Sequence, residues 1–356
     1  MPLQNPHRKT ATSHHVRQSH GSIFGLETSC DETAAAIMDT QGRVLSNIIS
    51  SQHDVHRPFG GVVPELASRS HIQTIETVVR TALDHAGLRW PDIGSIAVTQ
   101  GPGLAGALLV GLSYAKGLAY ALRIPLVAVS HLEGHIASAW IDDPSFPTSC
   151  VVLVVSGGHT HLYRTSSDGR YHLVGRTWDD AAGEAFDKGA QMLGLDQPGG
   201  PVLDRLATSG DPQRIHFPRS YVTRTGLDFS FSGLKTSLLY YLQDRNGHAT
   251  AQGQADIAAG YQEAIVEVLV HRAFQAVHES GVTALAVVGG VSANSRLRAL
   301  LADRAVAEGI QLSLPALGYC TDNAAMIAAA GRMALIRGRV TPLDCEAISN
   351  LELPAS

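Results

Sequence analysis

Apolar residues recur along the chain in blocks whose spacing switches between that of strands and that of helices. The stretch "GSIAVTQGPG" predicts a strand and a loop, residues 104–122 predict a helix, and "IPLVAVS" predicts another strand. Further on, a helix with Ile257, Tyr261 and Ile265 on its apolar face precedes the strand "ALAVVGG". Strands that alternate with helices in this way predict an α/β fold.

The same pattern occurs twice in the chain. "SIFGLETSCDETAAAIMDTQGRV" begins at Ser22 and "SCVVLVVSGGHTHLYRTSSDGRY" begins at Ser149, and the two align without a gap. Each stretch predicts a strand, a small polar turn, a second strand, a glycine-containing turn and a third strand. We interpret this as an internal duplication, with one copy of the pattern in each of two domains.

The length and composition of the chain agree with two domains. With 356 residues and 44% hydrophobic content, the chain can bury two cores. We predict an N-terminal domain at 21–148, a C-terminal domain at 149–340 and a tail at 341–356. Residues 1–20 contain no acidic residue and show no periodicity, which predicts a disordered leader, with an organelle transit peptide as the alternative.

Charge and cysteine content narrow the class of protein. The net charge of −5 excludes a globally basic nucleic-acid binder but leaves room for a local basic patch. The four cysteines form no C-x-x-C pair and favour a reducing, cytoplasmic compartment over a disulfide framework. The most apolar region, 104–129, is interrupted by Lys116, Arg123 and Pro125, so we expect no membrane span.

Short turns of small residues predict anion sites. Successive backbone N–H groups in a tight Ser/Gly turn form a concave anion site, and "VSGGHT" and its repeat partner "ETSCDET" are such turns. The corner "GGVSANSRLR" leads from a strand into a helix, where the helix N-terminus adds positive potential. Plain structural turns have the same composition, so these stretches alone do not establish a phosphate site.

Two histidines in "SHLEGHIASAW" share one face of a predicted helix. His131 and His135 are four residues apart, whereas Glu133 lies on the opposite side. Ser130 and Glu133 match a capping box, which gives Glu133 a structural role. The third metal ligand that we predict is Asp322, which follows Thr321, the expected N-cap of an Ala-rich helix. Two histidines and one carboxylate suit Fe²⁺ or Zn²⁺. Two histidines four residues apart are, however, also common in proteins that bind no metal.

A set of motifs occurs in an order that resembles a known family. The motifs include "GLETSCDETAAAI", "GGVVPELASRSH", "HLEGH", "VSGGHT", "GEAFDKGA", "DQPGGPVLD", "FSFSGLKT", "VVGGVSANSRLR" and "YCTDNAAMIA". Together they resemble the TsaD/Gcp family of tRNA threonylcarbamoyladenosine transferases over about residues 22–338. The resemblance implies two duplicated domains of the actin/Hsp70/sugar-kinase (ASKHA) fold with a ligand cleft between them.

The same resemblance implies an activity. The family transfers the threonylcarbamoyl group of threonylcarbamoyl-AMP to N6 of the adenosine 3′ to the anticodon, in tRNAs that read codons beginning with A. It also implies one divalent metal ion, Fe²⁺ above Zn²⁺, and two partners, a non-catalytic TsaB-like homologue and a TsaE-like ATPase. A mixed anhydride already carries an activated carbonyl, so the enzyme has to position the reactants and bind the leaving AMP.

The family motifs assign roles to particular residues of this chain. His131, His135 and Asp322 match the metal ligands, and Glu32 matches an acidic residue near the reacting end of the ligand. The remaining matches are substrate-binding residues: Val154, Val155, Ser156, Gly157 and Gly158 at the phosphates, and Asp187, Gly200, Asp204 and Asn294 at the ribose and base.

A basic stretch at 214–235 is our candidate for tRNA contact. It combines Arg219, Arg224 and Lys235 with Phe and Tyr, a mixture that suits contacts to phosphates and stacking on bases. An irregular surface loop is the alternative explanation.

Three other functions remain open at the level of the sequence. A metallopeptidase needs a base beside the metal, and Glu133 is misplaced for that role. A phosphotransferase of the same fold needs Mg²⁺ and a carboxylate base instead of a two-histidine site. A non-catalytic scaffold has no reason to keep His131, His135 and Asp322.

Overall fold

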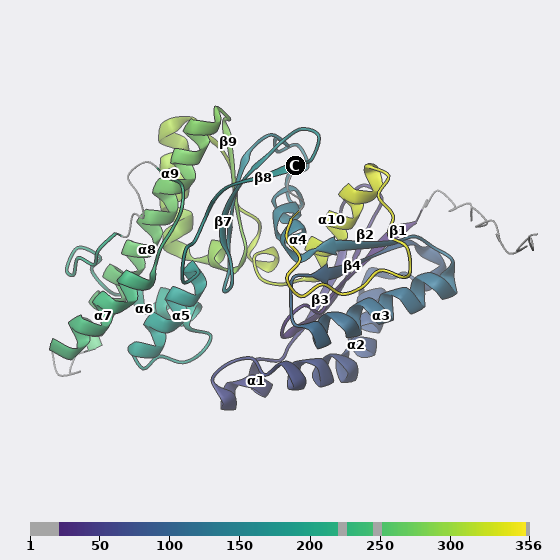
Figure 1. The fold of residues 1–356 in the computed structure, drawn as a ribbon, viewed down its shortest axis with the longest axis horizontal. Helices are drawn as coiled ribbons and strands as arrows, with labels where there is room; N and C mark the ends of the chain where they lie inside the picture. The colour runs from purple at the N-terminus through teal and green to yellow at the C-terminus, as the bar shows by residue number, and fades with distance from the viewer. Residues whose placement is uncertain (1–20, 220–225, 245–250, 354–356) are drawn as a thin grey trace, which may run out of the picture.

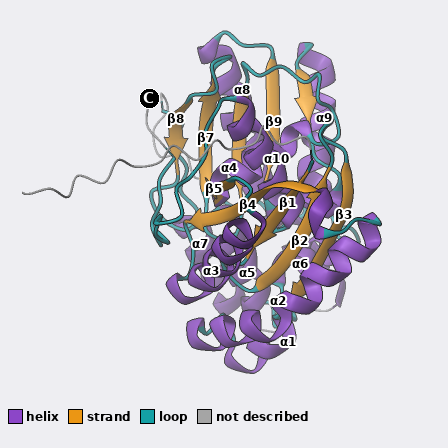
Figure 2. Cartoon of the chain, turned by 90° about the vertical axis from the view of Figure 1, so that its right-hand side faces the viewer, coloured by secondary structure: helices purple, strands orange, loops and turns teal. Residues whose placement is uncertain are grey.

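The computed structural model describes residues 21–219, 226–244 and 251–353, so the predicted leader at 1–20 and the end of the tail lie outside the described residues. The described chain forms two β-sheets, each flanked by helices (Figure 1). Figure 2 shows the strands of both sheets between layers of helix. This arrangement confirms the predicted α/β class.

The first sheet comes from the N-terminal part of the chain. Its strand order is β3-β2-β1-β4-β5, and the strands are β1 (Ser22–Glu27), β2 (Glu32–Met38), β3 (Val44–Ser51), β4 (Ile93–Gly101) and β5 (Leu126–Ser130). One face packs against α2 (Pro64–Ala86) and α3 (Ala105–Leu122), with Phe24, Leu26 and Val98 in that core. The short helix α1 (His53–His56) follows β3.

The second sheet repeats the first. Its strand order is β10-β9-β6-β7-β8, and the strands are β6 (Val151–Val155), β7 (Thr160–Thr165), β8 (Tyr171–Arg176), β9 (Ala284–Val288) and β10 (Gln311–Ser313). One face packs against the long helix α8 (Ala251–Ser280), through the largest core of the molecule. The other helices of this half are α5 (Ala182–Met192), α6 (Gly199–Ala207), α7 (Ser232–Asp244) and α9 (Ser295–Glu308).

The predicted duplication is confirmed down to single hydrogen bonds. In both sheets the first three strands are antiparallel and the last two are parallel to the first. Between the second and third strands, the N–H of Gly42 donates to Asp39 and that of Gly169 donates to Ser166, which are aligned pairs in the repeat. Both glycines have φ values in the left-handed region, 93° and 80°, where a side chain is disfavoured.

Helix α10 (Ala324–Ile336) packs on the first sheet although it follows the second sheet in the chain. Ala328 and Ile327 lie against Ala97 and Val127 on the sheet face opposite α2 and α3. The segment beyond α10 continues along the same half: Thr341 pairs with Leu126. Our predicted range 149–340 therefore contains a helix whose contacts are with the N-terminal half. As domain boundaries, 21–148, 149–340 and the tail remain predictions.

Helix α3 is long and apolar enough to cross a membrane by length and composition alone. In this fold it packs against α2 and β4, with Leu108 and Leu112 buried in the core of the first half. We therefore interpret α3 as a core helix of the domain.

Helix α4 (His131–Ala137) lies between the two halves. It follows β5 of the first sheet, and its Leu132 and Ile136 pack against Val152 and Ala286 of the second sheet. On its other side α4 contacts α10. Residues on α4 are thus held at the junction of the two repeats, which is where the predicted histidines lie.

Candidate active site and metal centre

The three predicted metal ligands meet at the junction of the two halves. His131 and His135 extend from α4, and Asp322 lies two residues before α10. The Nε2 atoms of the histidines are 3.4 Å and 3.1 Å from Oδ1 of Asp322. One ligand atom from each residue lies within 4.8 Å of the others, which is compatible with a shared metal ion.

The state of His135 supports this interpretation. Its side chain is fully buried, and neither ring nitrogen makes an aligned hydrogen bond with any described residue. Nε2 faces Asp322 without the alignment of a hydrogen bond. Buried polar groups almost always have partners, so an orphaned imidazole nitrogen beside a carboxylate fits a bound cation.

Glu27 is a residue of this site that the sequence analysis missed. It is buried at the end of β1, and its Oε2 lies 3.0 Å from Nδ1 of His131. A carboxylate can only accept, so Nδ1 of His131 carries the proton and Nε2 is left for a metal. Thr99 donates to the same oxygen at 2.7 Å. A carboxylate that orients a ligating histidine is a common second layer of metal sites.

A signal for Glu27 was present in the repeat. Glu27 aligns with Val154, so a charged residue stands at the end of a buried strand where its counterpart is apolar. Charged residues are rarely fully buried unless they have a partner. Only the fold, however, identifies His131 as the partner.

The charges of the site favour a cation between the carboxylates. Burial by itself would lower the pKa of His131, but Asp322 and Glu27 outweigh it and raise that pKa to about 9. Burial likewise opposes ionisation of Asp322, and the two histidines hold its pKa well below the usual range. The positive charge can be a proton on His131 or a metal ion, and a metal has to displace that proton.

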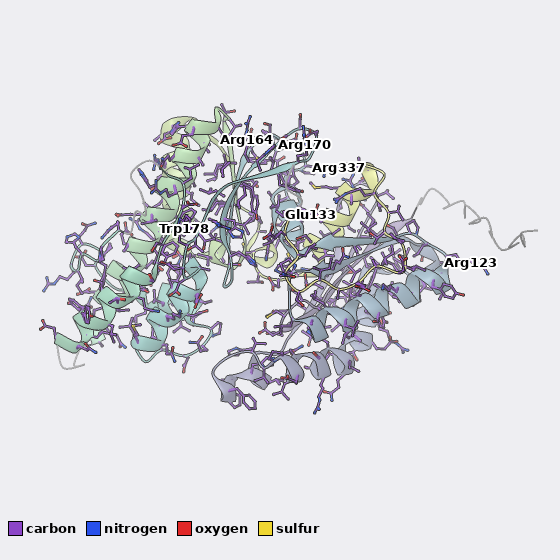
Figure 3. All side chains as sticks on the ribbon, in the orientation of Figure 1. Arg123, Glu133, Arg164, Arg170, Trp178 and Arg337 are labelled. Atoms are coloured by element: carbon purple, nitrogen blue, oxygen red, sulfur yellow. The ribbon has the colours of Figure 1, made fainter. Side chains whose placement is uncertain are left out.

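Glu133 has the structural role that its spacing predicted. The hydroxyl of Ser130 accepts from the N–H of Leu132, and the N–H of Ser130 donates to Glu133, which completes the capping box. The other carboxylate oxygen of Glu133 pairs with Arg339 at 2.9 Å. Figure 3 shows Glu133 near the middle of the molecule. Both oxygens are therefore engaged away from the metal ligands.

The prediction for Thr321 was wrong. The N-cap of α10 is Asn323, whose side chain accepts from the N–H of Met326. Asparagine, like threonine, is among the preferred N-cap residues, so the sequence allowed either Thr321 or Asn323 to form the cap. Asp322 thus lies in the turn before the cap, and Thr321 lines a cavity.

That cavity is a cleft of about 430 Å³ between the two halves, which we call the donor cleft. It brings together predicted residues from both repeats, and it is also lined by Thr321, the chain neighbour of the metal ligand Asp322. The sequence predictions that line it are Glu32, Gly157, Asp187, Gly200, Asp204 and Asn294. Of the remaining predictions, Val154 and Val155 lie inside β6, with their backbones paired to the neighbouring strand β7.

The turn at 156–158 borders the donor cleft. The N–H of Ser156 donates to the carbonyl of His159, and the hydroxyl of Ser156 accepts from the N–H of His159. These bonds close the turn and leave Gly157 and Gly158 exposed. Gly183, in the first turn of α5, packs so closely on Ser156 that a Cβ there would lie 2.6 Å from its carbonyl oxygen. The turn is therefore fixed against α5.

The predicted ribose and base ligands are held by the helices around the donor cleft. Asp187 on α5 accepts from the N–H of Gly200 on α6 at 3.1 Å. Asp204 accepts from the N–H and the hydroxyl of Ser295. Asn294 caps α9 and donates to Gln262 at 2.8 Å. All four predictions thus also have structural partners, and their positions in the donor cleft are fixed.

Glu32 faces the donor cleft from the first sheet. Burial, followed by the charges of Asp322 and Asp31, raises its pKa to about 9. These causes favour the protonated carboxyl group, which can donate a hydrogen bond to a ligand oxygen.

The basic stretch at 214–235 is only partly described. Arg224 lies outside the described residues, and the two other predicted contacts already have acidic partners. Arg219 pairs with Glu267 at 2.6 Å, and Lys235 lies 3.5 Å from Asp180. Contact of this stretch with tRNA remains a prediction.

Comparisons with known proteins identify the family of the chain. The sequence model of the TsaD family, described as tRNA N6-adenosine threonylcarbamoyltransferase, matches residues 43–329. The enzyme of that name from Syntrophotalea carbinolica is 51% identical, over 93% of this chain and 96% of its own. The one from Clostridioides difficile is 49% identical, over 93% and 98%.

Solved structures with low sequence identity share the fold. HypF from T. kodakarensis has a TM-score of 0.59 at 15% identity, covering 90% of this chain and 48% of its own. Component A of the (R)-2-hydroxyglutaryl-CoA dehydratase from Acidaminococcus fermentans has a TM-score of 0.54, also at 15%, covering 89% and 99%. These likenesses confirm the predicted ASKHA fold, and the sequence matches show that the chain belongs to the TsaD family of tRNA N6-adenosine threonylcarbamoyltransferases.

Proposed function

We propose that this threonylcarbamoyltransferase takes its acyl group from threonylcarbamoyl-AMP, bound in the donor cleft, and delivers it to the adenosine 3′ to the anticodon. N6 of that adenosine attacks the carbamoyl carbon, the bond from that carbon to the phosphate oxygen breaks, and N6 loses a proton. AMP leaves as an anion. The tRNAs concerned are those that read codons beginning with A.

One observation carries the proposal: the donor cleft, of about 430 Å³, is lined both by Gly157 of the 156–158 turn and by Thr321, the chain neighbour of the metal ligand Asp322. The turn at 156–158 can offer the backbone N–H groups of Gly157 and Gly158 to a phosphate. Asp187 on α5 and Asn294 at the start of α9 line the same cleft, as does Thr321. A ligand with phosphate at the turn and its base between α5 and α9 would place its acyl end beside the metal ligands.

The residues of the chain position the reactants. The turn at 156–158 would bind the phosphate of the leaving AMP, and Asp187 and Asp204 would accept from the ribose hydroxyls. Glu32, in its protonated form, could donate to an oxygen of the threonylcarbamoyl group. Protein nucleophiles are unnecessary, since the mixed anhydride is already activated. Fixing the two reactants in reach of each other supplies most of the acceleration.

His131, His135 and Asp322 would hold one divalent metal ion, Fe²⁺ before Zn²⁺, because two imidazoles and a carboxylate with open positions suit these metals. Such an ion supplies Lewis acidity toward a carbonyl or phosphate oxygen. Glu27 holds the His131 ring in the orientation that leaves Nε2 for the metal.

We further propose that the chain works in the cytoplasm with a TsaB-like homologue and a TsaE-like ATPase. The family membership supports these partners, and the four free cysteines support a reducing compartment.

The test combines activity with metal content. The protein is purified with its two partners and incubated with threonylcarbamoyl-AMP and unmodified tRNA, and the digested tRNA is analysed by mass spectrometry. We expect one modified adenosine for each AMP released. The His135→Ala variant should keep its fold, lose the metal and transfer nothing. Release of AMP without a tRNA adduct, or full metal content in His135→Ala, would contradict the proposal.

A further inference from the structure

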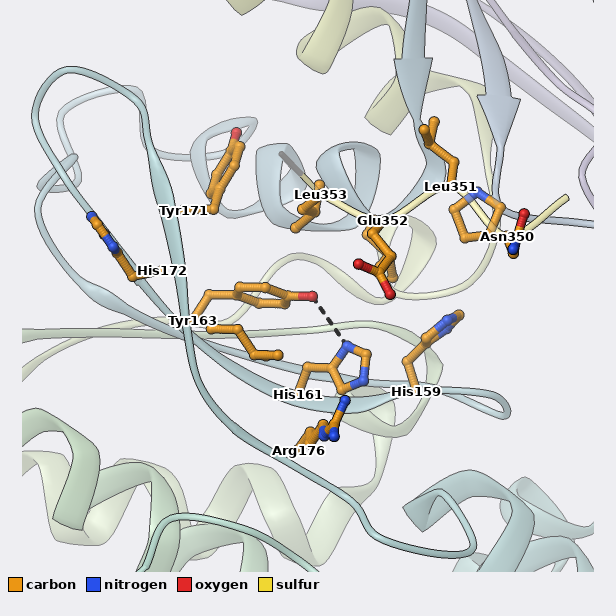
Figure 4. A pocket seen from close by; sticks show the side chains of 13 residues that line it. His159, His161, Tyr163, Tyr171, His172, Arg176, Asn350, Leu351, Glu352 and Leu353 are labelled. Atoms are coloured by element: carbon orange, nitrogen blue, oxygen red, sulfur yellow. Dashed lines mark hydrogen bonds between the residues drawn. The ribbon is translucent and has the colours of Figure 1, made fainter. Parts of the chain in front are cut away.

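A second cavity, of about 580 Å³, lies beside the donor cleft and has no role in the site described so far. The turn that closes on Ser156 separates the two, because Gly157 lines the donor cleft and His159 lines the second cavity. The walls of the second cavity come from β7, β8, α4 and the C-terminal segment. Figure 4 shows the lining side chains around a common space, among them His159, His161, Tyr163, Tyr171, Arg176 and Glu352.

Both cavities are lined by chain neighbours of the metal ligands. Thr321, next to Asp322, lines the donor cleft, whereas Leu132, next to His131, lines the second cavity. In acyl transfer the nucleophile attacks a face of the carbonyl group, so the acceptor has to reach the carbamoyl carbon from a space next to the donor. The second cavity borders the same turn as the donor cleft, at Gly157 and His159, and is therefore close enough to hold such an acceptor.

We propose that the second cavity is the acceptor site and receives the adenine ring of the tRNA nucleotide that is modified. This inference rests on the proposed function, because it takes the donor cleft as the place of the acyl-adenylate. The base would leave the stack of the anticodon loop and enter the cavity edge-on, with its N6 toward the metal ligands.

The walls of the cavity offer rings on which a base can stack. The rings of His159 and His161 are 5.4 Å apart, those of His161 and Tyr163 are 5.8 Å apart, and each pair is edge to face. Tyr163 is buried, and its hydroxyl lies 3.1 Å from Nδ1 of His161 (Figure 4). Splayed-out RNA bases are bound in this way, on the faces of Tyr and His side chains.

Polar groups at the cavity match the remaining parts of an adenosine nucleotide. In Figure 4 the carboxylate of Glu352 points toward the rings of Tyr163 and His159. It can accept from the exocyclic amine of adenine, which hypoxanthine lacks. Arg176 lines the cavity from the exposed end of β8 and can pair with a backbone phosphate.

The wall that carries Glu352 is fixed to the body of the protein. The N–H of Ile348 donates to Gln100, and the N–H of Gly103 donates to Ser349. Beyond Glu352, Leu353 is buried against the core that α4 shares with the second sheet. The C-terminal segment thus completes the cavity as a permanent wall.

The test separates acceptor binding from donor binding. His161→Ala and Glu352→Gln are compared with the wild type for the KM of tRNA, the KM of threonylcarbamoyl-AMP and metal content. Stacking on one side chain changes affinity about five- to hundredfold, so we expect the KM of tRNA to rise by such a factor in His161→Ala. The KM of the donor and the metal content should not change. His278→Ala, at an exposed histidine paired with Glu308 on the far helices, is the matched control.

A second measurement does not depend on variants. An anticodon stem-loop with 8-azidoadenosine at the acceptor position is photolysed on the wild-type complex, and the crosslinked peptide is sequenced. Crosslinks to 159–163 or 350–353 support the inference. If the wild type transfers the group, crosslinks to other residues, or an unchanged KM of tRNA in both variants, would overturn the assignment of the second cavity as the acceptor site. Loss of transfer in the wild type itself would instead overturn the proposed function, and the acceptor site with it.

Discussion

Glu27 and His131 are 104 residues apart in the chain, and a 3.0 Å contact joins the carboxylate of one to the imidazole of the other. Glu27→Gln keeps the size of the side chain but removes its charge, so the His131 ring loses the charge-assisted hydrogen bond that fixes its orientation and can pair only with a neutral amide. We expect metal affinity to fall about 10- to 100-fold, the usual effect of losing such a partner. Metal titration monitored by calorimetry measures this directly.

Glu133→Gln is the matched control, since Glu133 is also a buried carboxylate and lies on α4 itself. It should weaken the capping box and the pair with Arg339 but leave metal affinity within about twofold, because it does not contact a ligand. Equal metal affinities for Glu27→Gln and the wild type would contradict the role given to Glu27.

The contact of Gly183 with the phosphate turn gives a second prediction. In Gly183→Ala, the new Cβ would lie 2.6 Å from the carbonyl oxygen of Ser156, so the turn has to shift. Misplacement of a binding group by about 1 Å can cost 100-fold in rate, and we expect kcat/KM for threonylcarbamoyl-AMP to fall about 10- to 100-fold. Steady-state kinetics at saturating tRNA test this.

The control is Gly117→Ala in α3, where a Cβ meets nothing within 4 Å. Alanine is the better helix former, so this variant should gain up to about 1 kcal/mol of stability and keep its kinetics. Similar kinetics for the two variants would mean that the turn does not bind the donor.

The pH dependence of stability tests the burial of His159. Burial, with the neighbouring His161, lowers the pKa of His159 to about 4. Between pH 6.5 and 4 the unfolded chain takes up a proton at this position that the folded protein does not, so stability falls as the pH falls. Relative to His159→Gln, the metal-free wild type should lose on the order of 1–3 kcal/mol over this range. Urea unfolding at several pH values measures the difference, and parallel curves would contradict it.

The parts of this site that follow from local sequence were predictable. The spacing of His131 and His135 places them on one face of α4, and Ser130 with Glu133 begins that helix, because both depend only on helical geometry. The duplication was visible as well, since each copy keeps its own strands and turns. Asp322 was found through its family motif and its place before a helix.

The parts that were missed depend on contacts between distant segments. Nothing in the periodicity of α10 indicates that it returns to the first sheet, where Gly25 of β1 lets it approach closely. The partner of Glu27 is set by the same arrangement. The pairing of Arg219 with Glu267 on α8 could not be predicted either, because the two residues are 48 positions apart in the chain.

That pairing leads to the last prediction, which concerns tRNA binding. Arg219 donates from Nε to Glu267 at 2.6 Å and from Nη1 to the carbonyl of Phe217 at 2.7 Å. If Arg219 binds a tRNA phosphate, it has to leave Glu267, and that carboxylate also repels the RNA. Glu267→Gln should therefore strengthen tRNA binding. Arg219→Ala should weaken it and flatten the dependence of log affinity on log salt by about 0.7–0.9, because one contact no longer releases counterions.

Fluorescence anisotropy with labelled tRNA at several salt concentrations measures both variants. An unchanged salt slope in Arg219→Ala, or unchanged affinity in Glu267→Gln, would exclude a phosphate contact at Arg219, since such a contact requires both variants to respond.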